Sequence, residues 1–360
     1  MALDPVVVPH DRLADFIVSV LEALKMSPKN ARLTADLMVR TDLRGVDSHG
    51  IGMLPKYVEW TQAGFVHPWA DPVVARDDLA TALVDAQKGL GHPASAMSME
   101  LAISKAATYG MGIVAVRNSN HFGACANYSM MALARGMIGL AFTNSPFVAM
   151  VPTFGRKPMM GTNPISVAAP AGRREPYVLD MATTTVAVGK LHVASRWNKP
   201  VPEGWGLDEH AKPTTDPRKV LASRLLTPLG GSRELGSHKG YGLGVMVHIL
   251  AGCLSGASFS PLRNRTQKPS DPHNIGHFFL AIDPRAFRAE GEFEEDLDQV
   301  IDVLRGAKRA DPNQPVLIPG DPEMATRADR LEHGVPVPDD LMTQLRAVAK
   351  SAGVPFVLVQ

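Results

Sequence analysis

Four short polar segments interrupt the apolar stretches of this sequence, and each carries side chains that could take part in catalysis. They are residues 44–49, 118–121, 161–164 and 237–241. An unperturbed imidazole titrates at about pH 6.5, so His49 and His121 are candidates for proton transfer near neutral pH. Structural roles are also open to these residue types, because Asp47 or Ser48 could cap a helix and residues 118–120 could form a capped turn.

The surroundings of His49 predict how it would act as a base. Ser48 and His49 are adjacent, and adjacent residues do not face each other on a helix. A proton relay between them therefore requires the non-helical turn that Gly45 and Gly50 permit. If the next helix begins close to His49, the positive end of its dipole favours the neutral imidazole that accepts a proton.

The composition favours a soluble globular protein that acts on a small molecule. The 360 residues are 45% hydrophobic and 20% charged, and roughly 150 residues per domain suggests two domains. Lys+Arg 37 against Asp+Glu 36 leaves a formal charge of +1, which gives no electrostatic basis for binding nucleic acid or a membrane. Cys125 and Cys253 are too few for a disulfide framework, and the first residues lack the pattern of a secretory signal, so we expect a cytoplasmic protein.

The order of the expected elements favours an α/β fold. Apolar residues at helical spacing predict helices over residues 13–24 and 28–42, and a third through Tyr57 and Trp60. From Thr81 onward, strands alternate with helices, which is typical of an α/β sheet. We expect strands at 82–85, 112–116, 138–142, 165–169, 177–179 and 275–282, helices at 94–109, 124–135 and 186–197, a buried helix at 242–257, a long ordered excursion at 199–217 and a solvated helix face at 290–298.

Two glycine patterns resemble the dinucleotide-binding fingerprint but fit it poorly. Gly89 and Gly91 follow a strand and precede a helix, yet the next strand ends in Arg117 and Asn118, without the acid that binds a ribose hydroxyl. Gly110 stands before its strand, which is the wrong side for a phosphate-binding turn, and we interpret it as a helix C-cap.

Seven motifs, in order along the chain, resemble those of one enzyme family. They are Asp42-Leu-Arg-Gly-Val-Asp-Ser-His-Gly50, Ser119-Asn-His-Phe-Gly123, Gly161-Thr-Asn-Pro164, Leu179-Asp-Met-Ala-Thr183, His238-Lys-Gly-Tyr-Gly242, Asn274-Ile-Gly-His-Phe278 and Ile318-Pro-Gly-Asp321. On these motifs the chain is similar to the malate/L-lactate/ureidoglycolate/sulfolactate dehydrogenase family, which is unrelated to the Rossmann-type lactate and malate dehydrogenases. The resemblance implies a homodimeric oxidoreductase that uses NAD or NADP to interconvert small (S)-2-hydroxy acids and 2-oxo acids by hydride transfer.

The resemblance also implies a fold and individual roles. We expect a non-Rossmann α/β NAD(P)-binding domain at residues 81–283, and a helical substrate and dimerisation region formed by residues 1–80 and 284–360. His49 matches the family's proton donor and acceptor, Ser48 its relay partner, and His121 a histidine at the cofactor that is the base in some relatives. Thr162 matches a substrate contact. Cofactor contacts are implied for His121, Phe122, Gly123, Asp180, Met181, Ala182, His238, Lys239, Pro319, Gly320 and Asp321.

One departure from the family pattern bears on the substrate. Four residues after His49 the family usually has an arginine that binds the substrate carboxylate, and this chain has Met53. A thioether cannot replace a bidentate guanidinium. Either another cation, such as Arg44, Lys56 or Arg156, binds the carboxylate at the substrate site, or the substrate has a larger and less acidic acyl end.

The sequence leaves alternatives open. Imine-reducing relatives carry an acid shortly after the motif at residues 179–183, and Lys190 stands here, so we favour hydroxy acids over cyclic imine carboxylates. Met53 is also compatible with a cofactor-binding protein without catalysis. A metal-dependent lyase would need His49, His121 and His238 to converge on one ion; they lack ligand spacing, so we expect no metal. No residue is identified as a reader of the 2′ position, so NAD and NADP are both expected.

Overall fold

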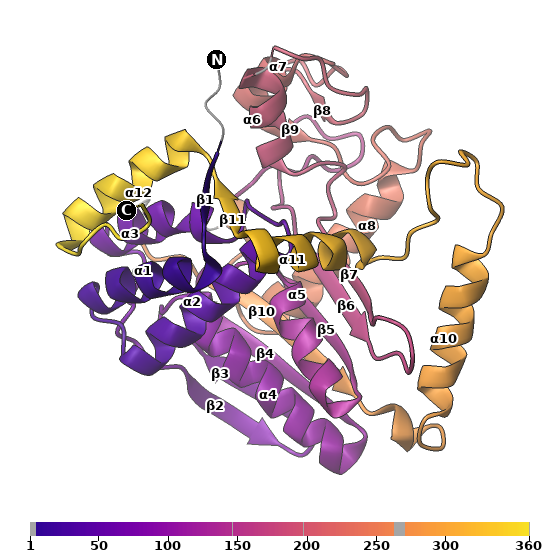
Figure 1. Ribbon diagram of the computed structural model, residues 1–360. Coiled ribbons are helices and arrows are strands. Elements are labelled where there is room, and N and C mark those ends of the chain that lie inside the picture. The colour runs from indigo at the N-terminus through magenta and orange to yellow at the C-terminus, as the bar shows by residue number, and fades with distance from the viewer. Residues whose placement is uncertain (1–4, 146, 197, 263–270, 360) are drawn as a thin grey trace.

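The computed structural model describes residues 5–145, 147–196, 198–262 and 271–359, and a seven-stranded sheet lies at its centre (Figure 1). In order across the sheet, its strands are β2 (Val73–Asp78), β3 (Thr81–Asp85), β4 (Met111–Ser119), β10 (Ile275–Ile282), β5 (Ile138–Thr143), β6 (Ile165–Ala169) and β7 (Tyr177–Met181). In the described residues β3 and β4 pair in parallel, and the other neighbouring strands of this sheet pair antiparallel. The expected α/β fold is confirmed, and its sheet is mixed.

The sequence predicts six of these seven strands and misses β2. All six residues of β2 are exposed, so the strand has no alternation of buried and exposed side chains. That alternation is the signal by which a half-buried strand is recognised.

Helices cover both faces of the sheet. Neighbouring residues of a strand point to opposite faces, and β10 shows both packing layers. Phe279 packs against α4 (Gly91–Tyr109) and α5 (Ala126–Ser129), whereas Phe278 packs against α8 (Ser237–Val247) and η3 (His248–Cys253). The expected helix at 124–135 is divided into α5 and the 3-10 helix η2 (Met130–Arg135). Gly110 is the left-handed C-cap of α4, as expected.

The two ends of the chain build one helical region beside the sheet (Figure 1). β1 (Val6–Val8) pairs antiparallel with β11 (Val335–Val337). A single apolar cluster joins α1 (His10–Ala23), α2 (Pro28–Leu43) and α3 (Leu54–Gln62) to α12 (Asp339–Ala352). The 3-10 helix η1 (Ile51–Met53) precedes α3, and α11 (Asp321–His333) contacts α2.

A smaller lobe and one outlying helix complete the molecule. The excursion expected at 199–217 lies in the lobe of α6 (Val188–Arg196), α7 (Pro217–Ser223), β8 (Gly206–Leu207) and β9 (Leu225–Leu226), at the top of Figure 1. The expected solvated helix face belongs to α10 (Glu292–Arg305). Asp298 is the exception: it is 2% exposed and accepts the N–H groups of residues 172–174. The 3-10 helix η4 (Pro284–Ala286) links β10 to this part of the chain.

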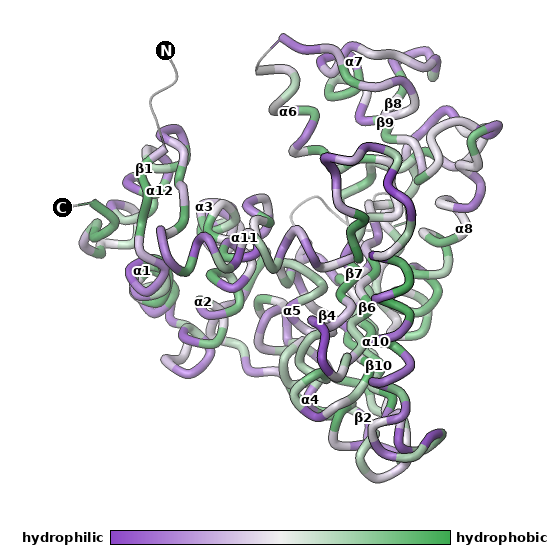
Figure 2. The backbone as a smooth tube through the Cα atoms, turned by 45° about the vertical axis from the view of Figure 1, so that its right-hand side comes forward, coloured by the Kyte–Doolittle hydropathy of each residue, from purple (hydrophilic) through white to green (hydrophobic). Residues whose placement is uncertain are grey.

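The prediction of a buried helix at 242–257 is correct only in part. α8 ends at Val247 and continues as the π-helical η3, and Met246, Ile249 and Leu254 are 36%, 53% and 58% exposed. Figure 2 colours the chain by hydropathy, and α8 is polar in its first turn and apolar further along. The error arises because hydropathy counts apolar residues without showing which side of a helix lacks a packing partner. Within the described residues, no helix is long and apolar enough to cross a membrane.

Candidate active site

Ser48 and His49 lie in the turn that the sequence predicts. Gly45 has a φ of +77°, which closes the end of α2, and residues 47–50 form turns and bends before η1. In this non-helical backbone the Ser48 hydroxyl lies 2.8 Å from Nδ1 of His49. The expected contact between the two side chains is therefore present.

The buried carboxyl group of Asp42 packs against this turn. An ideal Cβ at Gly50 would lie 1.9 Å from Oδ1 of Asp42, so no larger residue fits there. Oδ2 of Asp42 accepts the N–H of Ile51 at 2.7 Å, and burial raises the pKa of this carboxyl well above its usual range. Arg330 of α11 binds both the Asp42 carbonyl and the Asp47 carboxylate, which ties the turn to the C-terminal part of the chain.

His121 follows β4, and its hydrogen bonds define which ring nitrogen carries a proton. The N–H of Gly123 donates to Nδ1 of His121 at 3.3 Å, so Nδ1 must be an acceptor. The hydroxyl of Tyr57 lies 2.7 Å from the same nitrogen and must also donate. Burial raises the pKa of Tyr57, which keeps the hydroxyl protonated. Neutral His121 thus carries its hydrogen on Nε2.

The two histidines come together across the sequence. The rings of His49 and His121 stack with centroids 5.4 Å apart and an interplanar angle of 29°. Burial lowers the pKa of His49, and burial together with the neighbouring histidines, His49 first, lowers that of His121 well below its usual range. Both rings are neutral at pH 7. The expected helix dipole is not the cause of the lowered pKa of His49, because α3 begins only at Leu54.

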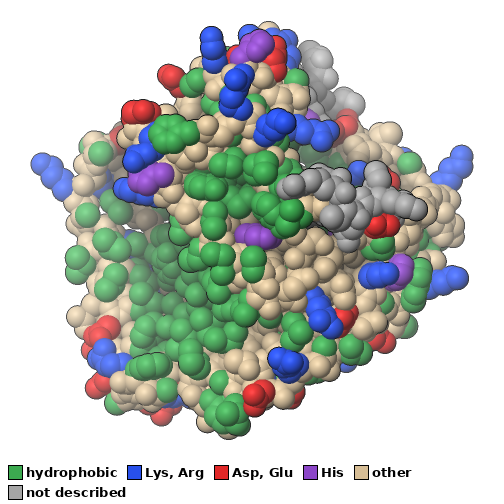
Figure 3. Space-filling view, turned by 180° about the vertical axis from the view of Figure 1, so that it is seen from behind, with side chains coloured by type: hydrophobic (Ala, Val, Ile, Leu, Met, Phe, Trp, Pro, Cys, Tyr) green, Lys and Arg blue, Asp and Glu red, His purple; other side chains and the backbone are tan. Residues whose placement is uncertain are grey.

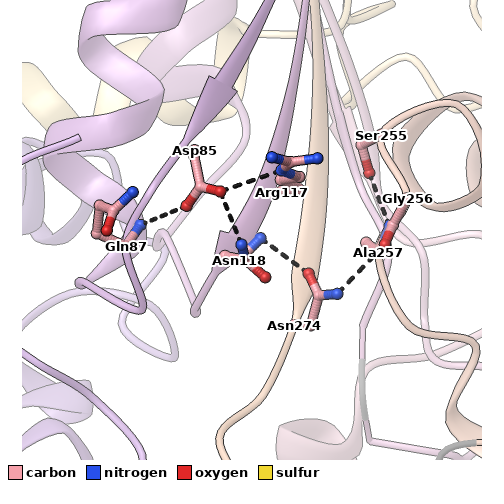
Figure 4. A network of polar contacts seen from close by, with 8 residues as sticks. All are labelled: Asp85, Gln87, Arg117, Asn118, Ser255, Gly256, Ala257 and Asn274. Atoms are coloured by element: carbon pink, nitrogen blue, oxygen red, sulfur yellow. Dashed lines mark hydrogen bonds and ion pairs between the residues drawn. The ribbon is translucent and has the colours of Figure 1, made fainter. Parts of the chain in front are cut away.

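A polar network fixes the end of β4 just before His121 (Figure 4). Asp85 of β3 accepts hydrogen bonds from Nε of Arg117 at 3.0 Å and from Nδ2 of Asn118 at 2.8 Å. Oδ1 of Asn274, which precedes β10, accepts the N–H of Asn118 at 2.8 Å. Asn118 has a φ of +50°, a conformation that asparagine tolerates better than most residues. Three chain segments thus hold the backbone that leads into His121.

Two further histidines near the pair are buried. His277 of β10 is buried, and its ring nitrogens lie 2.7 Å from the hydroxyls of Thr143 and Ser119. His92 of α4 is equally buried and packs edge-on to Tyr57, but neither ring nitrogen has a hydrogen-bond partner in the described structure. Burial lowers the pKa of His92 and of His277 to about 3 in each case.

Aromatic side chains form one wall beside His121. Trp60 of α3 lies edge-on to the His121 ring with centroids 6.5 Å apart, and it stacks on Phe147 at 5.7 Å. His273 contacts both Trp60 and Phe147. Trp60 is 5% and Phe147 48% exposed, so the wall reaches the surface. It favours an apolar group next to the paired histidines.

The cations considered for a substrate carboxylate lie elsewhere or are engaged. Lys56 is paired with Glu59 at 2.8 Å. Arg156 is exposed on the loop before Thr162. Arg44 caps the end of α2 and lines a groove between α1, α2 and α11, where it contacts Met324. Met53 is half-buried in η1, packed against the helical cluster.

The predicted cofactor segments are brought together in part. The Pro319 carbonyl accepts the N–H of Val178, so residues 319–321 lie against β7, next to residues 180–182. Gly320 packs there with a φ of +108°, and an added Cβ would lie 3.3 Å from the Val178 nitrogen. Asp321 bonds to Arg305 at 2.6 Å and to the N–H of Ile318.

Asp180 connects these segments to the helix that follows His121. Its Oδ2 accepts the N–H of Ala126 at 2.7 Å, and desolvation raises the pKa of this carboxyl to about 6. The Thr162 carbonyl accepts the N–H of Thr183, which places the expected substrate contact beside the same segment.

The other predicted cofactor residues differ in how far they are exposed to solvent. His238 and Lys239 are exposed in the first turn of α8. Gly123 lies between the His49 carbonyl and the His92 ring, where an added Cβ would be 3.5 and 3.0 Å away. Phe122 is 1% exposed, its ring stacks on His277 at 4.4 Å and its carbonyl accepts the Tyr128 hydroxyl, so this residue belongs to the core.

Sequence reasoning misses Tyr57, His92 and Trp60. Tyr57 and Trp60 have the spacing of core residues on a helix, and their meeting with His121 depends on how α3 packs against the end of β4. Within the described residues, no group of three histidine, cysteine or acidic side chains is arranged to hold a metal ion.

Comparisons with known proteins identify the relatives of this chain. A family model described as malate/L-lactate dehydrogenase matches residues 8–346. A malate dehydrogenase of Pyrococcus horikoshii is 42% identical over 350 residues, 96% of each chain, and an L-sulfolactate dehydrogenase of Methanocaldococcus jannaschii is 36% identical over 337 residues, 94% of each. The crystal structure of malate dehydrogenase from Entamoeba histolytica matches with a TM-score of 0.92 at 33% identity, covering 98% of this chain and 99% of that one.

A reductase of cyclic imine carboxylates is a more distant relative. The Δ1-pyrroline-2-carboxylate/Δ1-piperideine-2-carboxylate reductase of Pseudomonas putida is 35% identical over 286 residues, 79% of this chain and 81% of its own. The fold and these matches define a dehydrogenase that acts on CH–OH groups. The chain belongs to the malate/L-lactate dehydrogenase family.

Proposed function

We propose that this chain interconverts a 2-hydroxy acid and its 2-oxo acid with NAD or NADP, and that the stacked pair of His49 and His121 carries the proton chemistry. The observation behind the proposal is the stacking of two neutral imidazole rings with centroids 5.4 Å apart. In each ring Nδ1 is already hydrogen-bonded, to Ser48 in His49 and to Tyr57 in His121. A base near neutrality and an oriented donor are what oxidation of a hydroxyl group requires.

His49 is the group that takes the substrate hydroxyl proton. A neutral imidazole has one acceptor nitrogen, and uptake of the proton at Nε2 leaves an Nδ1–H that donates to the Ser48 hydroxyl. That hydrogen bond stabilises the imidazolium and holds its orientation. In the reverse direction the same nitrogen returns the proton.

His121 serves as a hydrogen-bond donor to the substrate oxygen. Gly123 and Tyr57 occupy its Nδ1, so Nε2–H is the group it offers. A neutral donor of this kind polarises a carbonyl without itself losing a proton.

The predicted cofactor residues fit an anionic dinucleotide. Gly236 caps α8 without a side chain over the first-turn N–H groups, and Lys239 lies exposed in that turn, which together suit a phosphate. Asp180 to Ala182 and Pro319 to Asp321 line the neighbouring β7 edge. The dinucleotide supplies the hydride acceptor or donor when bound.

We propose that the sheet binds the dinucleotide in a non-Rossmann manner. A Cβ at Gly91 would lie 2.4 Å from the Asn120 carbonyl, so close chain packing explains this glycine without a pyrophosphate. We also propose the division into a dinucleotide-binding domain of residues 81–283 and a helical region of residues 1–80 and 284–360, from which β2 extends the sheet at its edge.

The substrate side chain next to the acid group is apolar in this proposal. Met53 stands where relatives carry an arginine, and Trp60 and Phe147 form the adjoining wall. In this proposal, the substrates of the family differ in the side chain next to the 2-hydroxy acid group, and this chain takes substrates in which that side chain is larger and uncharged.

We further propose a homodimer in the cytoplasm. Figure 3 shows apolar side chains gathered around a hollow on the face opposite the view of Figure 1. Exposed apolar residues occur on α8 and η3, and on α10 as Val300, Val303 and Leu304. Apolar surface of this kind is typical of subunit interfaces. Reduced thiols at Cys125 and Cys253 suit the cytoplasm.

The test is nicotinamide absorbance with NADH and NADPH in parallel, against 2-oxo acids of graded side chain, including sulfonated and dicarboxylic members, and against cyclic imine carboxylates. We expect turnover with 2-oxo acids, an abolished rate in His49→Asn, and a rate loss of about tenfold in Ser48→Ala. For oxidation, the rate should hold until the pH drops below about 6.5, because the lowered pKa keeps His49 unprotonated. Turnover of imines alone, or full activity in His49→Asn, contradicts the proposal.

A further inference from the structure

A groove of about 630 Å³ lies between α1, α2 and α11, with η2 on one side. Among the described residues, its lining includes neither His49 nor His121 nor Tyr57. Four arginines line it: Arg32, Arg40, Arg44 and Arg327. We call it the arginine groove.

Most of the positive charge in the arginine groove lacks a close partner. Arg32 is paired with Asp15 at 2.8 Å and lies 3.9 Å from Asp36. In the part of the chain that the structure describes, Arg40, Arg44 and Arg327 have no carboxylate within 4.0 Å. Arg40 and Arg44 are four residues apart at the end of α2, a spacing at which like charges repel.

Arg44 is the most unusual of the three. It is 6% exposed, and among the described residues the hydrogen-bond partner of its Nη1 is the Met324 sulfur at 3.6 Å, which is a weak acceptor. Burial lowers the pKa of Arg44; the carboxylates of Glu323 and Asp180 raise it, and Arg327 and Arg40 lower it again. A buried cation without a paired anion is costly, so its retention points to an anion that binds there.

The rest of the lining is mixed: His10, Asp11 and Asp36 contribute polar groups, two of them carboxylates against four guanidinium groups, and the other side chains are apolar. Val39, Leu43, Met130 and Met324 lie between the guanidinium groups. Guanidinium forks match the oxygens of a phosphate group, and flexible thioethers pack well against a flat ring. The volume is in the range of roughly 300 to 1,000 Å³ that small-molecule ligands use.

We propose that the arginine groove binds a phosphorylated nucleoside, with Arg40, Arg44 and Arg327 on the phosphate and the apolar wall against the base. The phosphate belongs either to the 2′ position of NADP or to a separate nucleotide. The proposal is independent of the reaction proposed above, because binding is measured without substrate and without turnover.

Calorimetric titration of the full chain tests the proposal at fixed ionic strength. The probes are 2′,5′-ADP, which carries the phosphate of NADP, together with ATP and inorganic phosphate. We expect at least one nucleotide probe to bind, and its affinity to fall about tenfold or more in the double variant Arg40→Gln/Arg327→Gln. Both residues are exposed, so the variant should fold. Arg218→Gln, an exposed arginine of α7, is the matched control and should bind as the wild type does.

A second variant separates a binding role from a structural one. Arg44→Met removes the buried charge and keeps the bulk of the side chain, so its melting temperature should be unchanged or higher while nucleotide affinity falls. Loss confined to 2′,5′-ADP assigns the groove to the 2′-phosphate of NADP, and loss for ATP as well assigns it to a separate nucleotide. The proposal is overturned if no probe binds the wild type, if only inorganic phosphate binds, or if the double variant binds nucleotides normally.

Discussion

The hydroxyl of Tyr57 donates a hydrogen bond to Nδ1 of His121 over 2.7 Å, and this contact joins the helical region to the end of β4. Tyr57 is 1% exposed, so the bond is shielded from water. Because Nδ1 accepts the Gly123 N–H, it carries no hydrogen, and the tyrosine hydroxyl must be the donor in its own bond to Nδ1. Tyr57 is therefore a positioning residue, which fixes the tautomer of His121.

Removing this hydroxyl should reduce turnover more than substrate binding. In Tyr57→Phe one donor to Nδ1 remains, so the Nε2–H tautomer loses part of its advantage. We expect kcat to fall about tenfold, the equivalent of roughly 1.4 kcal/mol for one buried hydrogen bond, with KM changed by less than about threefold. Nitrogen NMR of the histidine rings should show a protonated Nε2 in the wild type and a mixture in the variant.

A purely structural role for Tyr57 predicts a different pattern. It would lower the melting temperature and leave kcat per folded molecule and the ring-nitrogen spectrum as they are. Val58→Ala, at the neighbouring buried position of α3, is the control for lost packing.

His92 and His277 offer a matched pair for stability against pH. Each is buried, and burial holds its pKa at about 3, below the unfolded value of about 6.5. Between these limits the unfolded chain binds a proton that the folded chain does not. The free energy of unfolding therefore decreases as the pH falls through this window, by about 1.4 kcal/mol per pH unit for each fully responding histidine.

Leucine at the two positions should have opposite effects at pH 7. His92→Leu removes two unpaired nitrogens and should be neutral or stabilising by about 1 kcal/mol, whereas His277→Leu leaves the Thr143 and Ser119 hydroxyls without their partner and should cost about 2 kcal/mol or more. Both variants should flatten the loss of stability below pH 6.5. Urea unfolding at several pH values measures this; equal destabilisation of both variants would contradict the assignment.

Gly50 should tolerate no side chain. A Cβ there would meet the buried carboxyl group of Asp42 at 1.9 Å, and that group is held by the Ile51 N–H. We expect Gly50→Ala to cost about 2 kcal/mol or more of stability and to displace His49, with loss of activity in the fraction that folds. Thermal unfolding and turnover measure the two effects.

The control for this change is Gly189→Ala on α6. No atom lies within 4 Å of its Cβ position, and alanine is the better helix former, by about 0.5–1 kcal/mol. If both alanine variants were equally stable, the close approach of Asp42 to Gly50 would not be real.

The sequence reveals the residues at the site more readily than their surroundings. Ser48, His49 and His121 stand in polar segments between apolar elements, so residue type alone marks them. Tyr57 and His92 have the appearance of core residues, and their importance arises only when α3 and α4 meet the end of β4. The same limit explains Arg44: its separation from the paired histidines depends on the direction in which α2 ends, which no local pattern encodes.

Met53 provides the most direct test of how the substrate is selected. It lies in η1, four residues after His49, where the family resemblance implies an arginine. Of the cations considered as replacements, Lys56 is paired with Glu59, Arg44 lines the arginine groove, and Arg156 is exposed on the loop before Thr162. A guanidinium placed at this position can bind a carboxylate with two hydrogen bonds, worth about 1.5–3 kcal/mol when charged. We expect Met53→Arg to raise kcat/KM for dicarboxylic substrates relative to apolar 2-oxo acids by about tenfold or more. Met53→Lys, which lacks the planar fork, should give a smaller change, and Met53→Leu none.

If all three variants keep the wild-type ranking of substrates, residue 53 does not face the substrate, and the aromatic wall of Trp60 and Phe147 must select it without help from η1.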